Sequence, residues 1–232
     1  MGEHSMSKPV PNRRHWLLAC GSVLGLSTAR VAKAQAAAGT PLPAMTEGPF
    51  YPPQRWRDSG ASHRDWDADL TQVRRGAQTL RAEGEHLSLA TRVIDTQGRP
   101  LDRCEVEIWQ CDARGTYHHP SVNMAAADPG FQGFGAASTN AAGELRLRTI
   151  RPVPYPGRTP HIHVKLRHAS MGEWTSQLFL AGDAGNARDF IWRGLNALAQ
   201  QAATLRLLDA GPEAAKESGL RWTARMDWVV PA

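Results

Sequence analysis

Two histidines separated by one residue, His161 and His163, begin a segment in which apolar and polar residues alternate. In a β-strand successive side chains point to opposite faces, so both imidazoles would lie on one face. Their Cβ atoms would then be roughly 7 Å apart, close enough for both rings to bind one metal ion. Two polar residues on a solvated strand face would give the same motif. The pair therefore indicates a metal site only if other donors accompany it.

The tyrosines are the candidate further donors, because the chain has only three: Tyr51, Tyr117 and Tyr155. Tyr155 stands between two prolines, which restrict its backbone and hold its phenol in one direction. Tyr117 follows a predicted strand and a turn at Gly115. Phenolates are hard anionic donors, so two phenolates with two imidazoles suit ferric iron. Packing in an apolar core is the alternative explanation for each ring.

The segments that must position these side chains have the period of β-strands. Six of them stand between turn signals, at residues 87–93, 104–109, 144–150, 161–167, 175–180 and 221–230. One helix is predicted over about 188–202, where apolar residues recur on one face, at Phe190, Ile191, Leu195 and Leu198. The pattern predicts an all-β fold, an antiparallel β-sandwich with long wrapping loops and one C-terminal helix.

The 232 residues fall into three parts by composition. Residues 1–36 are typical of a twin-arginine signal peptide: Arg13 and Arg14 precede an uncharged stretch, and small residues at 34–36 offer a cleavage point. An ordinary secretory signal is the alternative. Residues 37–84 are expected to form a leader and wrapping segment with little periodicity. Residues 85–232 are expected to form the catalytic β-sandwich domain, because they contain all the candidate metal ligands. The expected location is exported, either periplasmic or secreted.

Charge and hydropathy exclude two classes of partner. Residues 1–36 hold five basic residues and one acidic residue, so they carry four of the five net positive charges. The remainder is nearly neutral and has no charged surface for nucleic acid. The uncharged stretch after Arg14 is too short to span a bilayer, so no stable membrane insertion is expected once the signal is removed.

Longer blocks of the sequence resemble those of the intradiol ring-cleavage dioxygenases, nearest the protocatechuate 3,4-dioxygenase branch. The blocks occur in the family's order, at 46–53, 106–117, 148–152, 155–158 and 160–163. The resemblance implies an oxidoreductase with non-haem Fe(3+) that acts in aromatic compound catabolism. Such an enzyme cleaves a catechol-type ring with O2, incorporates both oxygen atoms and yields a cis,cis-muconate.

The resemblance also implies roles for individual residues. Four of them would be metal ligands: Tyr117, Tyr155, His161 and His163. Tyr155 would leave the metal when substrate binds and act as a base. Arg158 would face the substrate ring, and Gln177 would lie beside that arginine. Two aromatic residues would line the substrate: Tyr51 and Trp109.

Two other functions fit part of the pattern. The first is a secreted copper or zinc protein that uses His161, His163 and either His118 or His119. The second is a non-catalytic secreted β-sandwich that binds aromatic or sugar ligands with its eight tryptophans. The ordered blocks around all four proposed ligands favour the dioxygenase. The sequence leaves open which catechol is cleaved and whether the chain forms a homo-oligomer.

Overall fold

The computed structural model describes residues 39–53 and 66–232. The predicted signal peptide at residues 1–36 therefore lies outside the described residues. The chain divides into two compact units, Met1–Ala34 and Gln35–Ala232, and the second contains every described residue. In that described part, no helix is long and apolar enough to cross a membrane.

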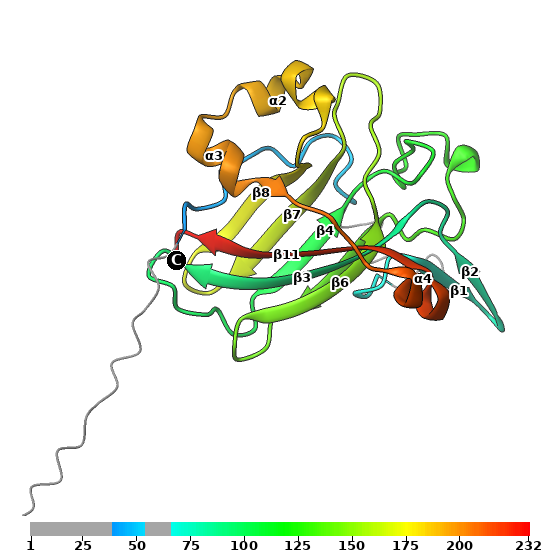
Figure 1. Ribbon diagram of the computed structural model, residues 1–232, viewed down its shortest axis with the longest axis horizontal. Helices are drawn as coiled ribbons and strands as arrows, with labels where there is room; N and C mark the ends of the chain where they lie inside the picture. The colour runs from blue at the N-terminus through cyan, green and yellow to red at the C-terminus, as the bar shows by residue number, and fades with distance from the viewer. Residues whose placement is uncertain (1–38, 54–65) are drawn as a thin grey trace, which may run out of the picture. The chain divides into compact units, whose positions relative to one another are not determined.

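Most of the regular structure consists of strands, arranged in two larger sheets and a hairpin (Figure 1). The hairpin pairs β1 (Gln72–Arg75) with β2 (Gln78–Arg81). The four-stranded sheet runs β10 (Leu208–Asp209), β11 (Leu220–Val230), β3 (His86–Asp95), β6 (Glu144–Ile150). The five-stranded sheet runs β5 (Phe134–Ser138), β4 (Glu105–Trp109), β7 (His161–His168), β8 (Gly172–Leu180), β9 (Thr204–Leu205). All six predicted strands are confirmed, as β3, β4, β6, β7, β8 and β11.

One hydrophobic cluster joins the two larger sheets. Its buried members on the four-stranded sheet include Leu87, Leu89, Leu147 and Trp228, and those on the five-stranded sheet include Ile108, Ile162, Val164 and Leu178. Because strand side chains alternate between faces, the odd-numbered residues of β7 lie on the face opposite Ile162 and Val164. The shared core therefore leaves the other face of the five-stranded sheet for His161 and His163.

The expectation of purely antiparallel sheets was wrong for two strand pairs. β11 runs parallel to β3, and β9 runs parallel to β8. Parallel neighbours need a crossover connection, since a tight turn can join only antiparallel strands. The connection from β8 to β9 spans residues 181–203 and contains η2 and two short helices, and most of the domain lies between β3 and β11.

The predicted single helix over residues 188–202 was also wrong. The structure has a 3₁₀ turn, η2 (Ala184–Arg188), followed by two short helices, α2 (Phe190–Arg193) and α3 (Ala197–Ala202). Gly194 ends α2, and Asn196 begins α3 because its side chain accepts a hydrogen bond from the Ala199 amide. The apolar stripe does not face a core, since Phe190 is 68% exposed. Elsewhere in residues 39–53 and 66–232 the helical elements are η1 (Met124–Ala126) and α4 (Pro212–Ser218).

Candidate metal centre

The four proposed ligands come from one strand and two loops. His161 and His163 lie on β7 and are each 2% exposed. Tyr117 follows β4 and is 4% exposed, whereas Tyr155, in the loop between β6 and β7, is half-buried. The pleat of one strand thus places both imidazoles on a single face.

Three donor atoms meet in a small triangle. Tyr117 Oη lies 3.4 Å from His161 Nε2 and 3.2 Å from His163 Nε2. The two Nε2 atoms are 3.2 Å apart. A point equidistant from the three atoms is about 1.9 Å from each, close to the roughly 2.0–2.2 Å bonds that nitrogen and oxygen donors make to a transition-metal ion. The triangle has the size of a metal-binding site.

Neighbouring groups fix the directions of both imidazoles. His161 Nδ1 lies 2.6 Å from the Thr159 carbonyl oxygen, which can only accept, so this nitrogen carries the proton. The lone pair of His161 is therefore on Nε2, within the triangle. The His163 ring is stacked on the Trp109 indole, with centroids 4.8 Å apart and an interplanar angle of 11°.

Tyr155 stands next to this triangle. Its ring centroid lies 5.4 Å from that of Tyr117 and 5.6 Å from that of His161. Burial raises the pKa of Tyr155, and the positive charge of Arg158 offsets part of this increase. Phe50 covers the pair of phenols, because its ring stacks on Tyr117 at 4.5 Å and lies edge-on to Tyr155 at 6.2 Å.

The electrostatics favour binding of a highly charged cation. Burial, and then the positive charge of Arg158, lowers the pKa of His161 to about 4, and burial lowers that of His163 well below its ordinary range. Both imidazoles are therefore neutral and able to bind metal near pH 7. Burial raises the pKa of Tyr117, so its phenolate requires a strong positive charge beside it. A donor set of neutral imidazoles and buried phenols fits ferric iron.

A polar network adjoins the donors. Arg158 Nε donates to Asp189 Oδ2 at 2.7 Å, and Arg158 Nη2 donates to Gln177 Oε1 at 2.7 Å. Gln177 lies opposite His163 in the β7–β8 register, and its Nε2 donates to the Thr46 carbonyl at 3.2 Å. The structure thus brings the predicted Arg158 and Gln177 together, and it adds Asp189, which the sequence analysis did not single out.

Comparison with known proteins identifies the family of this chain. A family model described as Dioxygenase matches residues 59–227, which is most of the chain. This chain belongs to the intradiol ring-cleavage dioxygenases. It is 37% identical over 120 residues to the protocatechuate 3,4-dioxygenase beta chain of Burkholderia cepacia, covering 48% of this chain and 51% of that protein. It is 25% identical over 168 residues to a catechol 1,2-dioxygenase of Acinetobacter baylyi, covering 65% and 50%.

The chain thus spans about half the length of these curated relatives. A solved structure of more similar extent is the dioxygenase domain of a dioxygenase–carbohydrate-binding fusion from Streptomyces sp. SirexAA-E. That domain superposes with a TM-score of 0.57 at 27% identity, over 83% of this chain and 99% of its own. The likeness therefore extends over nearly the whole of that dioxygenase domain.

Tyr51 and Trp109, proposed to line the substrate, contact groups that support the centre. The Tyr51 hydroxyl donates to Glu107 Oε2 at 2.7 Å and accepts from Arg167 Nη2 at 2.9 Å. Its ring lies edge-on to Trp109 at 4.9 Å, and Trp109, only 1% exposed, reaches the centre through His163. Contact of either ring with substrate stays a prediction.

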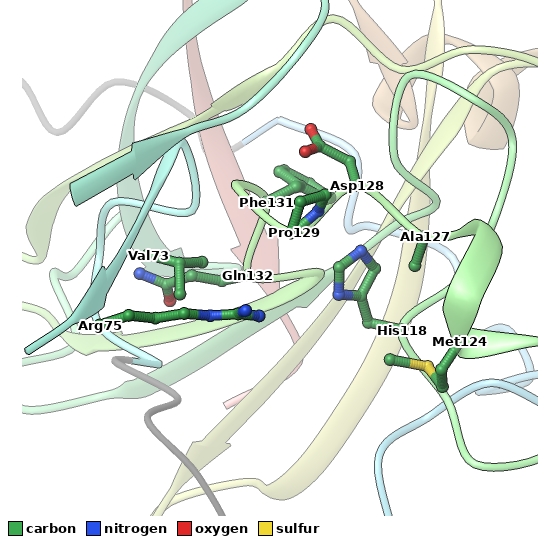
Figure 2. A pocket seen from close by; sticks show the side chains of 9 residues that line it. All are labelled: Val73, Arg75, His118, Met124, Ala127, Asp128, Pro129, Phe131 and Gln132. Atoms are coloured by element: carbon green, nitrogen blue, oxygen red, sulfur yellow. The ribbon is translucent and has the colours of Figure 1, made fainter. Parts of the chain in front are cut away.

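The two other histidines considered as ligands lie in different surroundings. His118 lines a separate cavity of about 130 Å³ with Met124 and Phe131 (Figure 2), and its Nε2 is 3.5 Å from Asp112 Oδ2. His119 Nδ1 lies 2.7 Å from Ser121 Oγ. Within residues 39–53 and 66–232, no three histidine, cysteine, aspartate or glutamate side chains gather to hold one ion. The copper or zinc alternative thus has no third ligand of these types in this part of the chain.

The lowered histidine pKa values give a pH prediction for protein freed of metal by a chelator. Between about pH 6.5 and pH 4 the unfolded chain binds more protons at His161 than the folded chain, so stability falls as pH falls. From pH 7 to pH 5, His161 alone should cost about 2 kcal/mol of unfolding free energy. Urea titrations of the protein and of H161Q measure this difference. H168Q, which changes a more exposed histidine on the same strand, is the control. If the unfolding free energy of H161Q fell equally steeply from pH 7 to pH 5, the effect could not be assigned to His161.

Proposed function

We propose that the chain is an Fe(III)-dependent intradiol dioxygenase that cleaves a catechol-type ring with O2 to a cis,cis-muconate. The triangle of Tyr117 Oη, His161 Nε2 and His163 Nε2, with sides of 3.2–3.4 Å, carries the proposal. Membership of the intradiol family supports it, as do the curated relatives named for action on protocatechuate and catechol. The proposed fold is a β-sandwich, which the core cluster common to both sheets supports.

Four residues would hold the ferric ion: Tyr117, Tyr155, His161 and His163. When bound, the ion would act as a Lewis acid that favours the doubly deprotonated diol and its reaction with O2. Tyr155 is half-buried, and the positive charge of Arg158 acts to lower its pKa, whereas Tyr117 is buried under Phe50. Tyr155 is therefore the phenol with room to move, and its Oη would take a proton from a substrate hydroxyl.

Arg158 would stabilise negative charge on the substrate ring. Its side chain is only 9% exposed, so its field is weakly screened by water. Gln177 and Asp189 hold the guanidinium from two sides, and a donor fixed before reaction need not reorganise when charge develops. The two histidines contribute neutral donors that keep their orientation through the hydrogen bond to Thr159 and the stacking on Trp109.

Oxygen uptake by iron-loaded protein tests the proposal. A panel of catechols that differ in ring substituents should include at least one that consumes O2 in proportion to substrate. Mass spectrometry with isotopically labelled dioxygen should find both labelled atoms in a ring-opened dicarboxylate. A product with only one labelled atom, or no uptake with any catechol by protein that has bound iron, would reject the proposal.

We further propose that the chain is exported by the twin-arginine route, on the basis of Arg13, Arg14 and the small residues at 34–36. Changing both arginines to lysine should block export and leave the protein inside the cell. R30K, a change outside the pair, is the matched control. Cell fractionation and N-terminal sequencing measure the outcome, and the mature chain should begin near Ala37. Full export of the double-lysine variant would instead indicate general secretion.

A further inference from the structure

Asp189 connects the helical segment after β8 to the arginine beside the metal centre. Its side chain is fully buried. One carboxylate oxygen, Oδ2, accepts from Arg158 Nε at 2.7 Å and from the Thr159 amide at 3.1 Å. The other, Oδ1, accepts from the Ile191 amide at 2.9 Å and the Trp192 amide at 3.1 Å. A single carboxylate thus joins the 158–159 segment to the start of α2.

This carboxylate restricts the guanidinium of Arg158. Nε is held by Asp189 and Nη2 by Gln177 Oε1, each at 2.7 Å, so the planar group is fixed at two edges. Gln177 is itself fully buried and bonded to the Thr46 carbonyl, which makes it a rigid partner. Without a carboxylate at position 189, a guanidinium that is 9% exposed would lack its countercharge and would turn toward water.

The same carboxylate supports a metal ligand through the backbone. The Thr159 amide donates to Asp189 Oδ2, and the Thr159 carbonyl accepts from His161 Nδ1 at 2.6 Å. The residue that orients His161 is therefore anchored by Asp189. Thr159 is also held by its own hydroxyl, which donates to Asn186 Oδ1 at 2.9 Å, so the orientation of His161 does not depend on Asp189 alone.

We propose that Asp189 is a positioning residue, whose carboxylate holds the Arg158 guanidinium toward Tyr155 and the bound substrate. It acts through Arg158 and, being fully buried, does not contact the substrate. A loss of turnover on removal of the Asp189 carboxylate rests on the proposed function, whereas a displacement of the Arg158 side chain does not. The structural alternative is that Asp189 only caps α2, in which case its loss would lower stability and leave turnover per folded molecule unchanged.

The variant D189N separates these roles, because it keeps an oxygen for the α2 amides and removes the negative charge. We expect kcat to fall about 10- to 100-fold through misplacement of Arg158, with iron content and the visible absorption band unchanged. N196A is the matched control: it removes the side-chain cap of α3, which accepts from the Ala199 amide at 2.9 Å. Its kcat should match that of the wild type. If D189N does not fold, D189S, which also offers a capping oxygen, replaces it.

A double-mutant cycle with R158A gives the decisive comparison. If Asp189 acts through Arg158, D189N should lower kcat no further in the R158A background. The proposal would be overturned if the fold-losses of kcat from D189N and R158A multiplied in the double variant. A wild-type kcat in D189N alone would also overturn it.

The crystal structure of D189N tests the positioning without any turnover. Displacement of Arg158 from Gln177 would support the proposal, and an Arg158 that stays in place would overturn it. An absence of ring cleavage in the wild type would instead contradict the proposed function, so the two failures are distinguishable.

Discussion

Replacing Tyr117 with phenylalanine should lower the affinity for ferric iron by about 100-fold or more, whereas replacing Tyr155 should leave part of the iron bound. Tyr117 Oη lies within 3.4 Å of both histidine donors and is shielded by Phe50, so it should remain a ligand throughout turnover. Tyr155 is half-buried and is the ligand proposed to leave. Y155F should therefore change the remaining visible band and lower turnover by at least about 100-fold.

Iron content, visible absorbance and thermal melting on the same samples distinguish these outcomes. Y51F is the matched control, because the third tyrosine directs its hydroxyl to Glu107 and should retain iron and colour. Equal effects of Y117F and Y155F on iron and turnover would contradict different roles for the two ligands. If both rings only pack in the fold, the variants would lose stability and keep the colour per folded molecule.

Replacing Arg158 with alanine should keep the iron, its colour and catechol binding but lower kcat by about 100- to 1,000-fold. The guanidinium is hydrogen-bonded to Asp189 and Gln177, and its proposed action is on the substrate ring. Turnover should be expressed per folded molecule, because R158A leaves the buried Asp189 carboxylate without its partner. R151A, which removes a more exposed arginine 3.5 Å from Glu85, is the control. Loss of iron, or turnover within about twofold of wild type, would contradict this role.

The strands were predictable because their apolar and polar residues alternate with the two-residue period. In β7 the sequence places Ile162 and Val164 on one face and His161 and His163 on the other, and the structure buries the apolar pair in the shared core. Strand β5 gave no such pattern. It contains Gly135, where an added Cβ would lie 2.3 Å from the Leu70 side chain, so its place depends on a distant segment.

The helix prediction failed because apolar periodicity was considered without the capping residues. Asp189, Gly194 and Asn196 mark two helix starts and one helix end inside the predicted span. These capping residues divide the segment into two helices, although its apolar period alone predicts one continuous helix. Exposed Phe190 and Leu198 show that the stripe did not mark a buried face.

The sequence blocks nominated the proposed ligands, and the structure adds two neighbours to which the sequence assigned no role. Phe50 directly precedes Tyr51, but its ring and not that of Tyr51 stacks on Tyr117. Asp189 lies outside the sequence blocks, and no local pattern pairs an aspartate with an arginine 31 residues earlier. Such contacts arise from tertiary packing, which a single sequence does not encode in a readable motif.

The visible absorption spectrum and metal content of the purified protein test the metal centre most directly. Ligation by Tyr117, Tyr155, His161 and His163 predicts a single ferric ion per chain and a burgundy colour from phenolate-to-iron charge transfer. The absorption band should shift in Y155F and decrease with the iron in Y117F. A colourless protein that holds copper or zinc, or a colour that both variants leave unchanged, would contradict the account.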